Sequence, residues 1–101
     1  MSLTVQTEQR ADVVVVSVAG ELDMATAPRL QDQITDLLEK GRTRLVFDLA
    51  EVSFCDGAGF SAVARLHDSQ RLERRNVHLL HPQHCFRRLA QVTGRTDMLP
   101  V

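Results

Sequence analysis

Asp56, Gly57 and Gly59 stand together at the junction between an apolar stretch, residues 45–49, and a second one, residues 60–72. The first stretch predicts a buried strand and the second a helix. The N-terminus of a helix exposes backbone N–H groups and the positive end of the helix dipole, so this junction suits an anion such as phosphate. The simpler interpretation is structural: the glycines permit a tight turn, and Asp56 caps the helix. Spacing alone favours the structural interpretation, because glycine-rich turns are common.

The junction lacks the spacing of known phosphate-binding loops, since neither GxxxxGK[ST] nor GxGxxG occurs in the chain. Nucleotide binding through such a loop is therefore not expected. No serine–histidine–aspartate arrangement is indicated either, and Asp48 and Asp56 flank the loop without a partner acid or base. The sequence favours a binding protein over an enzyme.

Three histidines and one cysteine lie close together in the sequence, and these residue types are common zinc ligands. They are His78, His81, His84 and Cys85. The first is expected on a strand, the second at its end and the other two in the first turn of a helix, so they do not share one face. We predict no metal site and no cofactor; half-exposed histidines around a loop are the favoured interpretation.

Cys55 directly precedes Asp56, and Cys85 is the only other cysteine. A disulfide requires Cα atoms within about 7 Å of each other. A redox switch through Cys55 and Cys85 is therefore a hypothesis, and burial as small hydrophobic side chains is the commoner role. Two cysteines in 101 residues suit a reducing cytoplasm better than a disulfide-stabilised secreted fold.

The elements that would position the junction follow from hydrophobic periodicity. The strand expected at residues 13–18 is almost wholly β-branched, which predicts burial on both faces or nearly so, and Gly20 is expected to end it. Thr26 is expected to cap a helix that Gly41 stops. Other strands are expected at residues 3–7, 45–49 and 77–80, other helices at 60–72 and 82–93, and a last edge pairing at 98–99.

This order of elements contains strand–helix–strand units, so part of the sheet should be parallel. We predict the α/β class, with a mixed sheet of four to five strands packed with three to four helices. At 101 residues the chain is large enough for one core, and we expect a single domain over residues 1–101.

Charge and composition argue against several classes of function. The net charge of −1 makes no case for direct binding of nucleic acid or of an anionic membrane. The chain has no apolar run of about 18 residues, which a transmembrane helix would need, and no signal-peptide pattern at its start. We therefore expect no membrane insertion and a cytoplasmic location.

Three stretches together resemble the STAS family, most closely its free-standing bacterial anti-sigma factor antagonists: Gly20-Glu21-Leu22-Asp23, Val52-Ser53-Phe54-Cys55-Asp56 and Gly59-Phe60. The resemblance covers essentially the whole chain and implies a STAS-like domain that is not an enzyme. It implies a protein that binds an anti-sigma factor of the histidine-kinase-like serine kinase fold, releases a sigma factor and so regulates transcription. Family members usually carry a further C-terminal helix, which this sequence, ending at Val101, is expected to lack.

In the proteins that the chain resembles, the junction reads Asp-Ser-Ser-Gly or Asp-Ser-Thr-Gly, and the second hydroxyl residue is phosphorylated by the partner kinase. Here the two hydroxyl positions are Gly57 and Ala58. The resemblance therefore predicts a docking turn without its phosphorylation switch, either locked in the binding-competent form or regulated by other means. Ser53 and Ser61 are the nearest hydroxyls, and we expect each to be a poor substitute.

The resemblance assigns the partner-binding residues to this turn and to one neighbour: Asp23, Asp56, Gly57, Ala58, Gly59 and Ser61. Two alternatives remain open. The first is the STAS subunit of a phospholipid-transport ATPase complex, which the short C-terminus favours and Ser53-Phe54-Cys55-Asp56 disfavours. The second is a small-anion or nucleotide-sensing domain that uses the N-terminus of the second helix.

Overall fold

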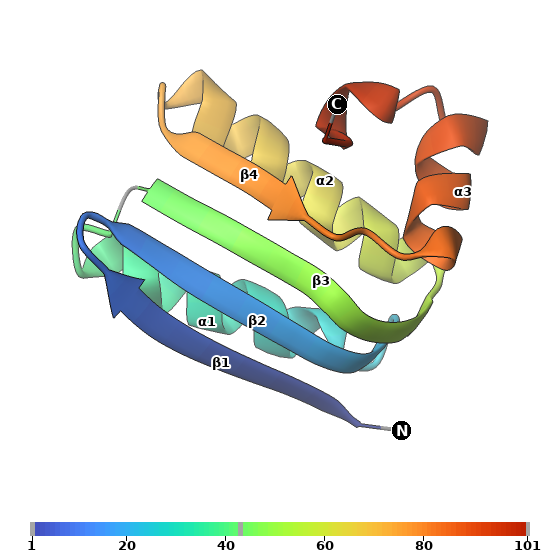
Figure 1. Cartoon of the computed structure of the whole chain (residues 1–101), viewed down its shortest axis with the longest axis horizontal. Coiled ribbons are helices and arrows are strands. Elements are labelled where there is room, and N and C mark those ends of the chain that lie inside the picture. Colours follow the sequence, from blue (N-terminus) through green and yellow to red (C-terminus); the bar gives the residue numbers. More distant parts are fainter. Residues whose placement is uncertain (1, 43, 101) are drawn as a thin grey trace.

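The computed structural model describes residues 2–42 and 44–100, which form one four-stranded sheet and three α-helices (Figure 1). The elements in chain order are β1 (Leu3–Arg10), β2 (Val13–Leu22), α1 (Ala27–Glu39), β3 (Arg44–Cys55), α2 (Gly57–Leu72), β4 (Asn76–Leu80), α3 (His84–Val92) and the 3₁₀ turn η1 (Thr96–Met98). None of the described helices combines the length and the hydropathy that crossing a membrane requires.

The strands lie in the order β1-β2-β3-β4. β1 pairs with β2 in the antiparallel direction, whereas β2, β3 and β4 run parallel to one another. Each parallel connection passes through a helix, as strand–helix–strand units require. The prediction of an α/β fold with a mixed sheet is confirmed, at the lower limit of the expected number of strands and helices.

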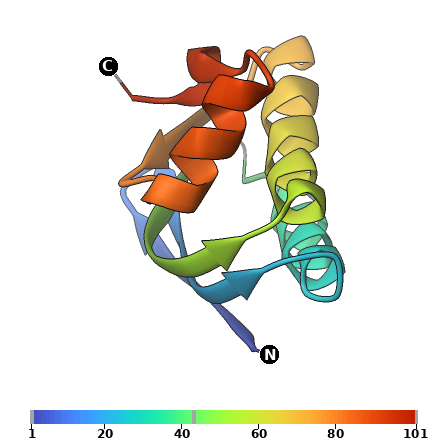
Figure 2. The ribbon, with the colours of Figure 1, turned by 90° about the vertical axis from the view of Figure 1, so that its right-hand side faces the viewer.

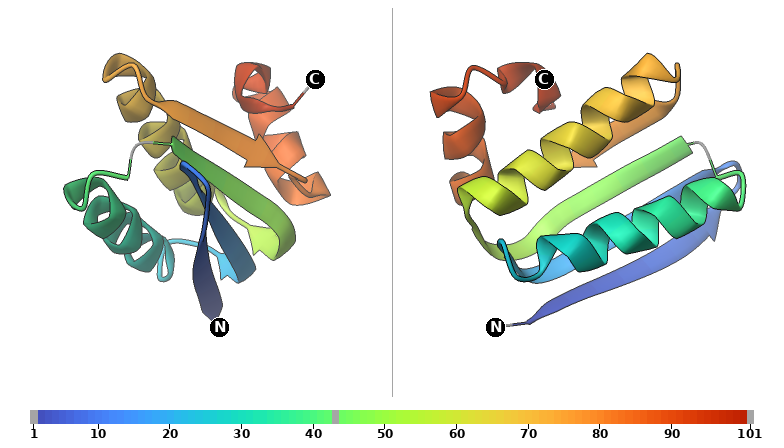
Figure 3. Two further views of the ribbon diagram at one scale, coloured as in Figure 1. Left: turned by 60° about the vertical axis from the view of Figure 1, so that its left-hand side comes forward. Right: turned by 180° about the vertical axis from the view of Figure 1, so that it is seen from behind.

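Two helices, α1 and α2, cover one face of the sheet, as the view from behind shows (Figure 3, right). α3 stands beside α2 (Figure 2), where the ring centroids of Phe86 and Phe60 lie 4.9 Å apart. The core lies between the helices and the sheet. Its largest fully buried side chains are Phe47, Phe86, Leu22, Leu30, Ile34, Leu45, Leu49, Val16, Val18 and Val63.

The opposite face of the sheet carries no helix from the described part of the chain (Figure 1). Val14, Val16 and Val18 point to the core and are buried, but Val13 and Val15 are only half-buried. The prediction that residues 13–18 are buried on both faces is therefore wrong, because a β-branched run fixes the strand and not what covers it.

Two strands extend further than their sequences predict. β2 does not end at Gly20: the backbone there has a φ of 103°, the pairing with β3 shifts register, and the strand continues to Leu22. A Cβ at Gly20 would overlap the carbonyl oxygen of Ser2, so only glycine fits where β2 passes the residue that precedes β1. β3 continues to Cys55. As a result, both strands reach the junction before Asp56.

The last edge pairing expected at residues 98–99 does not form. Residues Thr96–Met98 make a 3₁₀ turn instead, and the Met98 side chain is buried in the core. Arg95 fixes the approach to this turn, because its guanidinium donates to Asp68 at 2.7 and 3.0 Å and to Asp97 at 3.1 and 3.3 Å.

Candidate protein-binding site

The junction lies at the carboxyl ends of β2 and β3, which finish side by side with Leu22 opposite Cys55. The backbone N–H of Asp56 donates to the carbonyl oxygen of Leu22 at 3.2 Å. The loop after β2 and the turn after β3 therefore lie next to each other, at the end of the molecule that faces the viewer in Figure 2. Each of the two leads into the N-terminus of a helix, α1 or α2.

Asp56 joins these two connections through its carboxylate. Oδ1 accepts the backbone N–H of Gly59 at 2.8 Å, and Oδ2 accepts the backbone N–H of Met24 at 3.3 Å. The first bond caps α2, as the sequence predicts, and the second fixes the neighbouring loop. Because a carboxylate already occupies the N-terminus of α2, a second anion there would meet like charge, which disfavours the anion-sensing alternative.

Asp23 shapes the loop after β2 from inside. It is buried, and its Oδ1 accepts the backbone N–H groups of Ala25 at 2.9 Å and Thr26 at 3.0 Å. The hydroxyl of Thr26 accepts from the backbone N–H of Asp23 and donates to the carbonyl oxygen of Glu21 at 2.7 Å. Thr26 is the N-cap residue of α1, as the sequence predicts, but its side chain bonds back to the loop and makes no cap bond to the helix.

The surface of the junction is small and largely apolar. Gly57, Ala58 and Ser61 are exposed, and beside them the side chain of Met24 is 76% exposed and that of Phe54 45%. We call these five residues, Met24, Phe54, Gly57, Ala58 and Ser61, the docking surface. Asp23 and Gly59, which the family resemblance assigns to partner binding, are buried, and Asp56 is half-buried.

Sequence reasoning missed Met24 and Phe54. Met24 follows the end of a strand, in a loop where an apolar side chain is not expected to be buried. Its place in that loop is the sequence signal that could have indicated its exposure. Phe54 follows the exposed Ser53 in β3, where the strict alternation of buried and exposed residues breaks down. A large apolar side chain at such an irregular position is the kind that protein interfaces use.

Gly59 has a packing role instead of a surface role. A Cβ at this position would overlap the carbonyl oxygen of Leu22, and it would also crowd the Leu22 side chain. The first turn of α2 therefore approaches the end of β2 as closely as it does only because residue 59 has no side chain. By contrast, a Cβ at Gly57 would meet no atom within 4 Å.

The two candidate hydroxyls differ in what they already bond. The Ser53 hydroxyl donates to the carbonyl oxygen of Gly20 at 3.2 Å, across to the neighbouring strand. Ser61 is exposed but lies in the second turn of α2, within helical backbone. Ala58, at the position of the expected phosphoacceptor, is exposed in the first turn of the same helix.

Both cysteines are free thiols near the junction. Cys55 is buried and its Sγ lies 3.5 Å from the carbonyl oxygen of Asp56, whereas Cys85 is half-buried in the first turn of α3. Burial, followed by the proximity of Cys85 and of the Asp56 carboxylate, raises the pKa of the Cys55 thiol to about 12. A protonated thiol is a poor nucleophile, so Cys55 is unsuited to start thiol exchange.

The histidines near β4 do not gather. His78 lies on β4, His84 begins α3, and His81 places Nδ1 3.2 Å from Oδ1 of Asp48. The backbone N–H of Ala50, and then His81, lower the pKa of Asp48 below its usual value. Among residues 2–42 and 44–100, no three histidine, cysteine, aspartate or glutamate side chains lie close enough to hold a metal ion.

The chain is thus a small α/β domain in which Asp56 links two neighbouring connections at one end of the sheet. The chain belongs to the STAS domain family, whose match spans residues 4–101. It is 28% identical to the anti-sigma-B factor antagonist of Staphylococcus epidermidis over 101 residues, all of this chain and 94% of that protein. Its full-length relatives and its structural neighbours include proteins named anti-sigma factor antagonists.

Two solved structures illustrate the likeness of the fold. An anti-sigma factor antagonist from Mycobacterium paratuberculosis superposes with a TM-score of 0.81 at 29% identity, covering 98% of this chain and 84% of that one. The phosphorylated form of the Bacillus cell fate determinant SpoIIAA superposes with a TM-score of 0.76 over 94% of this chain and 87% of its own. At 23% identity, the second comparison concerns the fold alone.

Proposed function

We propose that this protein binds an anti-sigma factor of the histidine-kinase-like serine kinase fold, and that this binding releases a sigma factor for transcription. The observation that carries the proposal is the docking surface, where Met24 and Phe54 are exposed beside the capped N-terminus of α2. The likeness to a staphylococcal anti-sigma-B factor antagonist over the whole of this chain supports the same role. This role is binding and not catalysis, and it belongs in the bacterial cytoplasm.

The docking surface suits binding because it is ordered before a partner arrives. Asp56 ties Met24 to the start of α2, and Asp23 fixes the loop that carries Met24. A pre-organised surface loses less conformational entropy on association. Met24 and Phe54 supply adaptable and aromatic contact area, and both residue types are enriched in protein interfaces.

We further propose that phosphorylation at position 58 does not regulate this protein. A phosphate would add about −1.5 to −2 charges to an interface beside Asp56, and so would repel a docked partner. Ala58 has no hydroxyl to accept a phosphate. The docking surface therefore stays in its binding form, and control comes from the supply of the partner or from modification elsewhere in the protein.

Affinity capture from a native lysate, read by mass spectrometry, tests the proposal. The wild-type protein should capture a histidine-kinase-like anti-sigma factor, and Ala58→Asp should lose it because the added carboxylate imitates a phosphate. Ala11→Asp is the matched control, since Ala11 is exposed in the β1–β2 turn. Its φ of 55° is one that aspartate tolerates.

Capture of the same partner by wild type and Ala58→Asp alike would contradict the assignment of the docking surface. Capture of a transport ATPase in place of an anti-sigma factor would contradict the proposed function and favour the phospholipid-transport alternative.

A further inference from the structure

The uncovered face of the sheet is the feature that the proposed function leaves unexplained. Three of its four strands, β2, β3 and β4, are parallel, and parallel strands are normally covered on both faces. In the described part of this chain α1 and α2 cover only one (Figures 1 and 3). The outward-pointing residues of these three strands are called the open face below.

The centre of the open face is apolar. Val15 pairs with Val46, which pairs with His78, in one row across the three strands. Val13, Val15 and Val46 are half-buried, and Leu80 is 39% exposed. The residues that continue the face toward the docking end are small, namely Ser17, Ala19 and Ala50. The outward side chains of this part of β2 and β3 are therefore short, whereas the neighbouring strand β1 carries the longer Gln6, Glu8 and Arg10 on the same side of the sheet.

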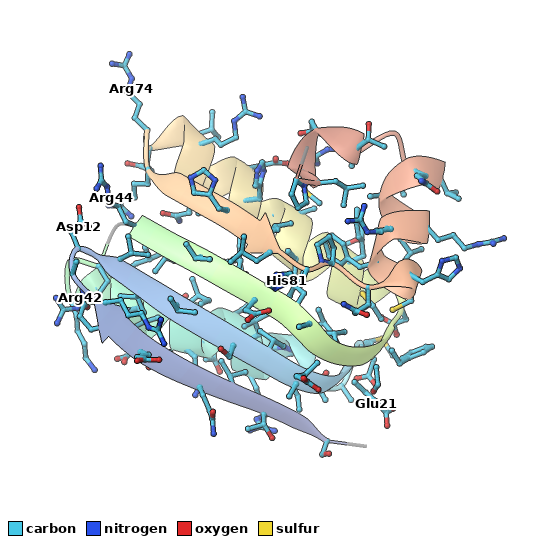
Figure 4. All side chains as sticks on the ribbon, in the orientation of Figure 1. Asp12, Glu21, Arg42, Arg44, Arg74 and His81 are labelled. Atoms are coloured by element: carbon cyan, nitrogen blue, oxygen red, sulfur yellow. The ribbon has the colours of Figure 1, made fainter. Side chains whose placement is uncertain are left out.

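Two opposite charges flank this centre on one strand. Arg44, Val46 and Asp48 alternate along β3, so all three side chains share the open face. Within the chain, Arg44 pairs with the exposed Asp12 (Figure 4), and Asp48 lies beside the exposed His81. Both charged side chains are nevertheless partly exposed to solvent: that of Arg44 is 51% exposed and that of Asp48 is 31%.

This order of charges is self-complementary. A two-fold axis that lies between two facing sheets, perpendicular to the strands and over Val46, brings Arg44 of one copy opposite Asp48 of the other. The same operation brings Asp48 opposite the second Arg44, and Val46 opposite itself. Facing sheets pack about 10 Å apart, a gap that a long arginine and an aspartate can bridge together. A partner with one sign of charge would satisfy one of these residues and repel the other.

We propose that the protein forms a symmetric homodimer in which the open faces of two copies pack against each other. Val13, Val15, Val46 and Leu80 form its apolar centre, and two reciprocal ion pairs between Arg44 and Asp48 set its register. The interface is isologous, as two-fold symmetry requires. It covers the face opposite α1 and α2, so both docking surfaces, at the sheet ends that lead into these helices, stay accessible.

Sedimentation equilibrium of charge-reversal variants tests the proposal. Wild type should be a dimer. Arg44→Glu and Asp48→Lys should each weaken dimerisation at least tenfold, because each places like charges opposite each other. An equimolar mixture of Arg44→Glu and Asp48→Lys should dimerise again, since the carboxylate introduced in one variant then faces the ammonium group introduced in the other. Arg42→Glu, an exposed arginine in the turn before β3, is the matched control and should leave the dimer intact.

A wild-type protein that stays monomeric up to its solubility limit would overturn the proposal, as would single variants that dimerise like wild type. So would a mixture of folded variants that stays monomeric, with folding verified by circular dichroism and thermal unfolding. The test is independent of the proposed function: Arg44→Glu should still capture the anti-sigma factor, and loss of the dimer with capture retained separates the two.

Discussion

At the scale of single residues, the junction depends on the close approach that Gly59 permits and on the hydrogen bonds that the Asp56 carboxylate accepts. Asp56 and Gly59 could be assigned structural roles from sequence, because a capping aspartate and a close-approach glycine are local requirements of a strand-to-helix turn. Met24 and Phe54 could not be placed on the surface in the same way. Their position beside each other depends on how two connections far apart in the chain meet, which no local pattern encodes.

The first prediction concerns the close approach of α2 to β2. Gly59→Ala should destabilise the protein by about 1–3 kcal/mol, because the new methyl group would overlap the carbonyl oxygen of Leu22 and force the helix away. Gly57→Ala, two residues earlier and in open space, should change stability by no more than about 1 kcal/mol, and in the stabilising direction. Urea denaturation of both variants measures the difference; equal stability would show that the helix can shift freely.

At the scale of elements, the sequence predicts which strands and helices exist better than where they end. β2 and β3 run on past Gly20 and Leu49 because each extends the pairing of the other, which is a tertiary effect. Residues 98–99 fail to form a strand because Met98 gains more from burial in the core than from edge pairing. The hydrogen bonds from Arg95 to Asp68 join the C-terminal segment to α2 and so hold this turn. The spacing of residues in the sequence does not predict them, because the two residues lie far apart in the chain.

The second prediction concerns the pH dependence of this C-terminal attachment. Hydrogen bonds from Arg95 hold the pKa of the Asp68 and Asp97 carboxyl groups below their usual value. A carboxyl group with a lowered folded-state pKa stabilises the protein above its unfolded pKa of about 4, and this stabilisation is lost as the pH falls through the folded pKa. Arg95→Ala should therefore lower the Tm at pH 7 and have less effect at pH 3.

Arg88→Ala is the control for this measurement, since Arg88 is exposed on α3. It should shift the Tm little at either pH. Thermal unfolding at both pH values, followed by circular dichroism, gives the comparison. If the loss in Arg95→Ala were the same at pH 3 as at pH 7, packing of the arginine and not its charge would hold the segment.

At the scale of the whole molecule, charge is distributed unevenly along the strands. Glu21 lies at the docking end, whereas Arg42, Arg74 and the ion pair of Arg44 with Asp12 lie at the opposite end (Figure 4). The carboxylates of Asp23 and Asp56 add to the negative charge of the docking end. Such a separation orients a charged partner during encounter and acts mainly on the rate of association.

The third prediction follows from this separation and rests on the proposed function. Glu21→Lys should slow association with the anti-sigma factor several-fold at low salt and weaken the salt dependence of the rate, because the docking end would lose negative charge. Glu39→Lys, at the far end of α1, should have little effect. Stopped-flow or surface-plasmon kinetics across a series of salt concentrations would decide, and a faster rate in Glu21→Lys would contradict the expected sign.

The cap on α2 has a consequence for how such a protein can change over time. Because residue 56 supplies the cap and residue 59 the close approach, exposed position 58 is left with little structural duty. A hydroxyl or a methyl group can stand there at similar cost to the fold. Regulation by a kinase can therefore be lost or acquired by a single codon change while the scaffold and its binding surface persist, so that closely related copies could differ in control and still compete for one partner.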